Sequence, residues 1–292
     1  MFSAALQPSS ARRSEAGAQL VMQRESRVQY GPVPRCLFGD PLPERTWQIK
    51  GDAFLLRGQG EHYFHYRRGT GVTVERGADS DLSEEGLWLN GSVYSAIASI
   101  NGLLPIHASA VAFDGKVFAF TGPAESGKST LVAALGSHGL PMFCDDTLVL
   151  DLSDPQRIVC LPGHKRLKLR PDAVALTRAS REEKVSRTYD KYYCSPAAGV
   201  VDVALPLAEL LFLEEGALAI VPIRGAERFA RMQDDHQTAR LFEAARRFDR
   251  ATQFSHQARL ATQISMTRLV RPLDRSRFRD SVALAASHVT RR

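Results

Sequence analysis

The chain has 292 residues, of which 44% are hydrophobic, and carries a formal net charge of +6 at pH 7. That length is enough for one large or two smaller domains with a sizeable core. No run approaches the roughly 18 apolar residues that a membrane span needs, so we expect no membrane partner. The first residues hold scattered arginines and glutamates without an apolar centre, unlike a secretory signal. We therefore expect a cytoplasmic protein.

The positive charge comes from arginine-rich segments, mainly in the second half of the chain, and favours an anionic partner. ATP would already be such a partner, and no aromatic and basic module accompanies the charge, so we expect no nucleic-acid binding. The cysteines are far apart and form no C-x-x-C pair, which argues against a zinc site or a disulfide scaffold. They are Cys36, Cys144, Cys160 and Cys194.

The first hundred residues predict three successive segments. Residues 1–29 are expected to be poorly ordered, and residues 30–88 to form a small β-rich region with short extended stretches at 46–49, 53–57 and 62–66. Histidines in the last stretch are explained better by strand packing than by a metal site, because no cysteine or further carboxylate has ligand spacing with them. Helical spacing of apolar residues then predicts a helix over 89–100.

A hairpin and a glycine-bounded loop follow this helix. Residues 104–113 predict a strand, and Asp114-Gly115 is a strong hairpin signal before a second strand at 116–121. The second strand leads into the pattern G-x-x-x-x-G-K-S, the phosphate-binding loop, and then into an amphipathic helix. A glycine turn without a nucleotide is the alternative, but strand, loop and helix in this order favour nucleotide binding.

Backbone N–H groups of such a loop and of the helix start can bind a polyphosphate. Lys128 is expected to reach the β- and γ-phosphates, and the Ser129 hydroxyl to bind Mg²⁺, which prefers oxygen ligands. ATP and Mg²⁺ are thus the expected cofactors. The candidate nucleotide-binding residues are Gly122, Pro123, Ala124, Glu125, Ser126, Gly127, Lys128, Ser129 and Thr130.

Two carboxylates, Asp145 and Asp146, lie within an apolar stretch at 142–150 that predicts a strand. Buried acids are costly unless paired or metal-bound. One of the two can hold Mg²⁺ while the other faces a substrate hydroxyl, and a polar turn within the strand is the alternative. The hairpin also brings His107 back along the strand that feeds the loop, which makes it a candidate beside the phosphates unless it serves packing alone.

In this order, residues 106–110, 122–129 and 143–146 resemble the catalytic core of the HPr serine kinase/phosphorylase family and its shorter HPr-kinase-like relatives. The similarity covers about residues 103–150 and, more weakly, 162–170. It implies an α/β fold, in which a P-loop kinase domain of the HPr-kinase C-terminal type at 89–292 follows the smaller β-rich N-terminal region.

The resemblance also implies roles for particular residues. Asp145 would be the base that takes the proton from a substrate serine, and Asp146 would support it or the metal. His107 would lie near the transferred phosphoryl group, beside Lys128. Because phosphoryl transfer needs mainly positioning and charge neutralisation, this short catalytic set suffices.

The chain also departs from the family. Residues 160–170 do not carry the glutamate-containing signature of the bifunctional enzymes, and the arginine-proline-glycine segment used in dephosphorylation is not evident. The shorter relatives include kinases of ribosomally made peptides such as lasso-peptide precursors, which fits these departures better. The implied function is ATP- and Mg-dependent phosphorylation of a serine in a peptide or small protein. HPr kinase/phosphorylase proper, a non-catalytic nucleotide-binding regulatory module, and a P-loop ATPase or GTPase are the alternatives.

Further candidates lie beyond this core. Arg166, Lys168 and Arg170 alternate with leucines, which predicts a basic stripe that binds phosphates or an acidic peptide tail, or protects an exposed edge strand. Residues 178–195 predict a long polar loop, a lid or a disordered segment, with Arg187 and Lys191 as candidate substrate contacts. The family's bifunctional members assemble into oligomers, so the resemblance also implies that this chain forms a homo-oligomer.

The rest of the chain predicts alternating strands and helices. Apolar runs at 210–213 and 218–223 read as strands, and 226–254 as an arginine-rich helical segment. A strand at 265–271 and a closing helix at 275–289 complete the expected fold.

Overall fold

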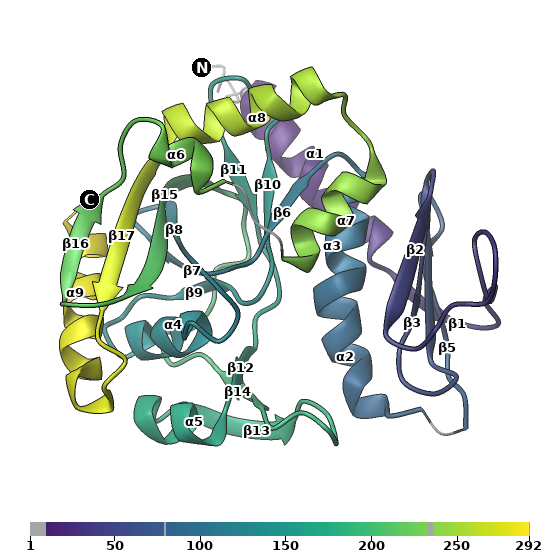
Figure 1. Cartoon of the computed structure of the whole chain (residues 1–292), viewed down its shortest axis with the longest axis horizontal. Helices are drawn as coiled ribbons and strands as arrows, with labels where there is room; N and C mark the ends of the chain where they lie inside the picture. Colours follow the sequence, from purple (N-terminus) through teal and green to yellow (C-terminus); the bar gives the residue numbers. More distant parts are fainter. Residues whose placement is uncertain (1–9, 79, 233–235, 292) are drawn as a thin grey trace, which may run out of the picture.

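The computed structural model describes residues 10–78, 80–232 and 236–291, which form a mixed α/β structure (Figure 1). Of the segment expected to be poorly ordered, residues 1–9 lie outside the described residues, whereas Ser10–Glu25 form helix α1. Its end is tied down because Glu25 is buried and accepts hydrogen bonds from the Tyr66 hydroxyl at 2.9 Å and from the Gly69 N–H at 2.7 Å.

The β-rich N-terminal region is one sheet of order β1-β5-β4-β3-β2. The stretches predicted as strands are strands, with an additional strand at each end of the series. Their bounds are β1 Val28–Tyr30, β2 Thr46–Lys50, β3 Ala53–Arg57, β4 Tyr63–Arg67 and β5 Gly71–Glu75. The pairs from β2 to β5 are antiparallel, and β1 runs parallel to β5.

A continuous helical segment separates this sheet from the rest of the molecule (Figure 1). It runs through η1 Leu82–Glu84, α2 Glu85–Trp88, the π-helical turn η2 Leu89–Val93 and α3 Tyr94–Ile100. The helix therefore starts earlier than the predicted residue 89. Its apolar side packs against Phe54, Phe64 and Tyr66 of the N-terminal sheet in one shared core.

The predicted hairpin belongs to the central sheet, between β15 Leu205–Glu215 and the edge strand β9 Met142–Cys144. Strands β7 Ala108–Phe113 and β8 Lys116–Thr121 are antiparallel, and Asp114 and Gly115 both have the positive φ that a tight primed turn needs. On its other side β8 runs parallel to β15, which in turn runs parallel to β17 Ser265–Arg271.

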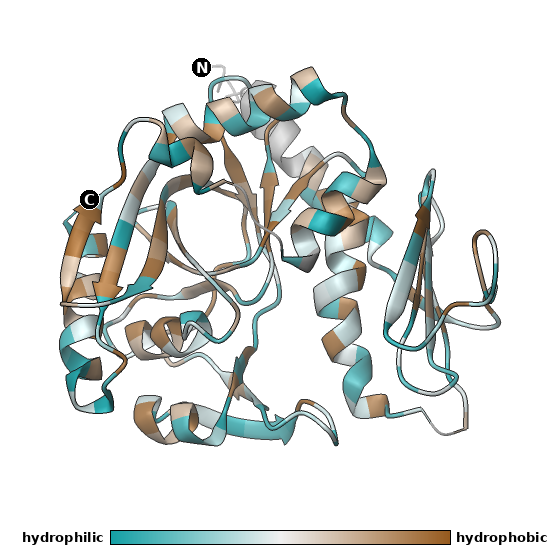
Figure 2. Cartoon of the chain, viewed as in Figure 1, coloured by the Kyte–Doolittle hydropathy of each residue, from teal (hydrophilic) through white to brown (hydrophobic). Residues whose placement is uncertain are grey.

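Strands β8 and β15 are apolar on both faces because helices cover both. Phe118, Phe120, Leu211 and Leu213 face one core with helices α4 Lys128–Gly136 and α9 Phe278–Thr290. The alternate residues of the same strands face a second core with helix α8 Arg250–Gln263. Figure 2 shows apolar residues along the strands of this sheet and polar residues along β13. The phosphate-binding loop thus follows a strand whose central residues, Val117 to Phe120, are buried.

The prediction of one continuous strand at 142–150 is wrong, because a turn interrupts it. The segment is split into β9 Met142–Cys144 and β10 Leu148–Asp151. Asp146 has a φ of 72°, and the Thr147 N–H donates to the Asp145 carbonyl at 2.9 Å, so the two aspartates form a turn. The polar-turn alternative therefore describes the backbone here. β9 pairs with β7, whereas β10 pairs with β6 Leu104–Ile106 and β11 Val159–Leu161.

Residues 178–195 were expected to form a long loop, but they contribute strands β13 Ser180–Lys184 and β14 Tyr192–Ser195. With β12 Leu167–Leu169 they make a small antiparallel sheet of order β12-β14-β13. Helix α5 Pro171–Thr177 connects β12 to β13. The sequence did not predict the pairing of β14 with β12, because apolar and polar residues do not alternate clearly in this charged segment.

The C-terminal part follows the predicted order. It comprises β16 Ala219–Pro222, α6 Glu227–Ala230, α7 Gln237–Ala245, α8, β17, the turn η3 Arg275–Arg277 and α9. Within the described ranges, the structure contains no helix with the length and apolar character of a membrane span.

Replacing Glu25 by alanine should lower the free energy of unfolding by about 1–3 kcal/mol, because the Tyr66 hydroxyl and the Gly69 N–H lose their buried acceptor. Urea denaturation measures this change. The matched control is Arg24→Ala, whose exposed side chain should contribute less than about 1 kcal/mol. Equal effects of the two substitutions would contradict the anchoring role of Glu25.

Candidate active site

The loop between β8 and α4 has the backbone of a phosphate cradle. Residues 122–127 connect the end of β8 to Lys128, the first residue of α4. Gly122, Glu125 and Gly127 have φ values of 147°, 63° and 83°. Gly127 also packs closely on Arg271, since a Cβ there would lie 2.6 Å from Nη2 of Arg271 and would displace that side chain. The loop is therefore curled at the start of a helix, as an anion site requires.

Lys128 lies across this loop. Its side chain is buried, and its Nζ donates to the carbonyl oxygens of Gly122 and Pro123 at 2.9 Å each. The ammonium is thus held beside the N–H groups of the loop, where a phosphate would meet both.

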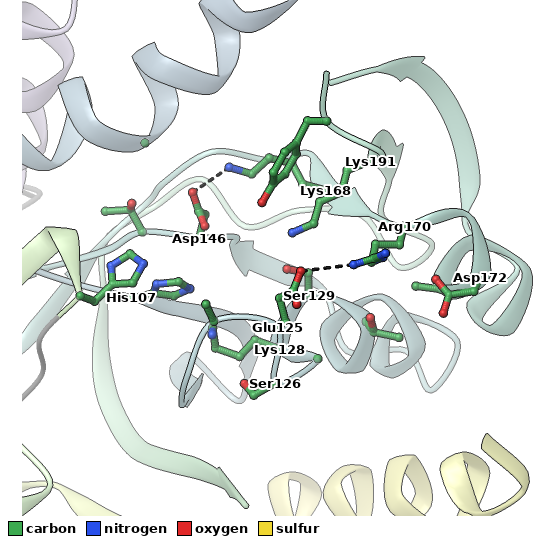
Figure 3. A pocket seen from close by; sticks show the side chains of 18 of the residues that line it. His107, Glu125, Ser126, Lys128, Ser129, Asp146, Lys168, Arg170, Asp172 and Lys191 are labelled. Carbon is green, nitrogen blue, oxygen red and sulfur yellow. Dashed lines mark hydrogen bonds and ion pairs between the residues drawn. The ribbon is translucent and has the colours of Figure 1, made fainter. Parts of the chain in front are cut away.

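A cavity of about 540 Å³ opens beside the loop (Figure 3). Its wall includes the loop and the start of α4, from Ala124 to Thr130. Across from them lie Asp146 and Lys168, together with Gly91 of the π-helical turn. A cavity of this size lies within the range of sites for small ligands and cofactors. It brings together segments that are far apart in the sequence.

The structure separates the two aspartates. Asp146 lines the cavity, and its Oδ2 accepts a hydrogen bond from Nζ of Lys168 at 2.7 Å (Figure 3). Burial by itself raises the pKa of Asp146, but the Lys168 ammonium outweighs it and holds that pKa well below its usual value. Asp146 is therefore an ionised carboxylate that faces the cavity at neutral pH.

Asp145 lies outside the cavity lining and is 1% exposed. Its Oδ1 accepts from the Ser109 hydroxyl at 2.6 Å, and its Oδ2 accepts from the Lys168 N–H at 3.0 Å. Both carboxylate oxygens thus have protein donors. Asp145 thus joins β7 to β12 and does not line the cavity, whereas the resemblance implies that it is the base.

Two histidines meet at another side of the cavity. The ring centroids of His107 and His236 are 3.6 Å apart, with the rings edge to face. Burial, together with the charges of Lys128 and His236, lowers the pKa of His107 to about 3. His107 is therefore a neutral imidazole at physiological pH. His236 was not singled out in the sequence, because nothing in its helical surroundings links it to the loop.

The basic candidates are divided between the cavity and the surface. Lys168, Arg170 and Lys191 line the cavity, and Arg170 also contacts Glu125 of the loop at 3.2 Å. Arg166 lies outside the lining and pairs with Glu182 and Glu183.

Arg187 also lies outside the cavity lining, and its exposed side chain is 3.8 Å from Asp81. The predicted basic stripe of Arg166, Lys168 and Arg170 does not form one exposed surface, because Lys168 is buried and paired with Asp146.

The oxygen ligands expected for Mg²⁺ face the same space. The Ser129 hydroxyl is at the start of α4, and the Asp146 carboxylate is on the opposite wall. Mg²⁺ usually takes one or two protein oxygens and completes its shell with phosphate and water. These two residues fit such a partial ligand set.

Because His107 and His164 have lowered pKa values, acid should destabilise the fold. Burial and nearby cations lower the pKa of His107 to about 3 and that of His164 to about 4. The unfolded chain then binds more protons below about pH 6.5, so the free energy of unfolding falls as the pH is lowered, by up to about 1.4 kcal/mol per pH unit for each histidine. Urea denaturation between pH 7 and pH 4.5 measures this slope.

His107→Gln should make that slope shallower. The control is His138→Gln, at an exposed position after α4, which should keep the slope of the unchanged protein. A slope that His107→Gln leaves unaltered would contradict the neutral, buried state of this side chain.

Comparison with known proteins gives similarity to solved structures only. No family model matches the sequence, and no curated protein matches it. The solved structures similar to this chain include the Hpr(Ser) kinase/phosphatase from Coxiella burnetii. The match has 14% sequence identity and a TM-score of 0.35, and it covers 63% of this chain and 87% of that chain. It concerns a part of the fold and not the reaction or the substrate.

Proposed function

We propose that this protein is a kinase that transfers the γ-phosphoryl group of ATP, with Mg²⁺, to a serine hydroxyl of a peptide or small protein. The observation that carries the proposal is the cavity that joins Lys128 and Ser129 of the curled loop to Asp146 and Lys168 opposite. Cations and an ionised carboxylate around one cavity are what phosphoryl transfer needs, because catalysis depends mainly on positioning and charge neutralisation.

The loop side would bind the nucleotide. Backbone N–H groups of residues 122–127 and the Lys128 ammonium would bind the phosphates. Phosphate oxygens would then replace the two loop carbonyl oxygens as acceptors for Lys128. Mg²⁺ would neutralise phosphate charge, with the Ser129 hydroxyl as a protein ligand. The loop that carries these groups is held between strand β8 and helix α4.

The opposite side would receive the acceptor. Asp146 takes the part that the sequence resemblance gave to Asp145, because of these two aspartates it is the one that lines the cavity. The Lys168 ammonium fixes its orientation at 2.7 Å and keeps it ionised. An ionised carboxylate can orient the acceptor hydroxyl and accept its proton as the phosphoryl group moves. The neutral His107 can donate or accept a hydrogen bond at the phosphoryl group without adding charge.

The choice of a peptide acceptor, such as a lasso-peptide precursor, rests on the sequence resemblance and on the departures from the bifunctional enzymes. HPr is the competing acceptor. The two are separated by experiment, since only the bifunctional activity predicts reversal of phosphorylation by inorganic phosphate.

The test is mass spectrometry of HPr and of a peptide precursor from the same genome after incubation with the protein and Mg-ATP. We expect a serine to gain one phosphate. Asp146→Asn should lower turnover by roughly two to four decades while nucleotide binding persists. Lys128→Ala should lose nucleotide binding as well, whereas Lys116→Ala, an exposed lysine on the same strand–loop–helix unit, should change neither.

Asp145→Asn separates the two aspartates. Measured on folded protein, it should lower turnover less than Asp146→Asn, because Asp145 contacts Ser109 and the backbone of β12 and not the cavity. The reverse order would return the role of base to Asp145. Nucleotide binding without phosphate gain on any acceptor would instead favour a regulatory nucleotide-binding module.

A further inference from the structure

Arg271 is a buried cation in an unusual position. It is the last residue of β17, and its side chain lines the cavity although it is only 7% exposed. Burying a guanidinium is costly unless an anion compensates it. Burial alone accounts for the lowered pKa of Arg271.

The contacts of Arg271 are incomplete. Nη2 donates to the carbonyl oxygen of Ser126, within the phosphate-binding loop, and packs against the position of Gly127. Nε is buried and has no hydrogen-bond partner among the described residues. Within residues 10–78, 80–232 and 236–291, no carboxylate forms an ion pair with this guanidinium.

Neighbouring arginines behave differently. Arg268, three residues earlier on β17, pairs with Glu227 at 2.9 Å. Arg170 and Arg275, which also line the cavity, contact Glu125 and Asp172 at 3.2 and 2.6 Å. Each has a carboxylate to balance its charge. Arg271 differs from them because it contacts a backbone carbonyl of the loop and no carboxylate among the described residues.

We infer that Arg271 is a phosphate-binding residue, and that the nucleotide's phosphates supply the anion that this buried guanidinium lacks. The inference rests on the proposed function, and it adds a cation from β17 to the loop and Lys128. A guanidinium has five N–H donors in a planar fork that matches phosphate oxygens. The contact with Ser126 holds the fork against the loop, at the wall of the cavity where a phosphate would lie.

This role makes a prediction that a structural arginine would not. In Arg271→Met, an apolar side chain of similar length replaces an uncompensated charge. Without ligand, the unfolding temperature should therefore be at least that of the unchanged protein. Affinity for Mg-ATP and for inorganic tripolyphosphate should fall by at least about tenfold, as expected for lost charge-assisted hydrogen bonds.

Arg271→Lys keeps the charge but not the planar fork of donors. Its affinity for each ligand should therefore lie between those of the unchanged protein and of Arg271→Met. The matched control is Arg268→Met on the same strand, which should leave both affinities unchanged because its partner is Glu227 outside the cavity lining. Isothermal titration calorimetry with tripolyphosphate and with Mg-ATP measures the affinities, and thermal unfolding measures stability.

The outcomes separate this inference from the proposed function. If the unchanged protein binds neither tripolyphosphate nor Mg-ATP, the proposed function fails. If it binds both and Arg271→Met binds them equally well, only the role of Arg271 fails. A lower unfolding temperature in Arg271→Met with unchanged affinity would show that Arg271 supports the fold alone.

Discussion

The buried carboxylate of Asp145 is the interaction on which the site depends. It joins the Ser109 hydroxyl of β7 to the Lys168 N–H of β12, and so ties the small sheet to the central sheet. The next residue, Asp146, lies in a turn with positive φ, in which the Thr147 N–H donates to the Asp145 carbonyl. That turn directs Asp146 to the cavity, and β12 brings Lys168 to meet it. One buried acid thus positions a second acid and its cation.

The distribution of charge around the cavity follows from this arrangement. Lys168 is balanced by Asp146, and Arg170 by Glu125. Lys128 and Arg271 both direct donors to carbonyl oxygens of the loop. A loop flanked by two such cations favours a polyphosphate over a neutral ligand, because desolvated charges interact strongly with an opposite charge.

The N-terminal region also contributes to the site, through the helical segment that packs on its sheet. The π-helical turn Leu89–Val93 interrupts this segment where Gly91 and Ser92 line the cavity. A Cβ at Gly91 would lie 3.7 Å from Oδ2 of Asp146, so the helix approaches the aspartate closely. Such π turns often occur at functional sites. The region predicted as a separate β-rich unit therefore supports one wall of the same cavity.

The sequence by itself determined the hairpin, the curled loop and the helix after it, because tight turns, glycine positions and apolar periodicity act over a few residues. It also identified Lys128, Ser129, His107 and the aspartate pair as candidates. Tertiary structure alone decided which aspartate faces the cavity, since that depends on the contacts of Asp145 with β7 and β12. It likewise brought His236 to His107, and Arg271 to the loop, from more than a hundred residues away. Such contacts leave no local pattern, because they are set by how strands far apart in sequence pair and pack.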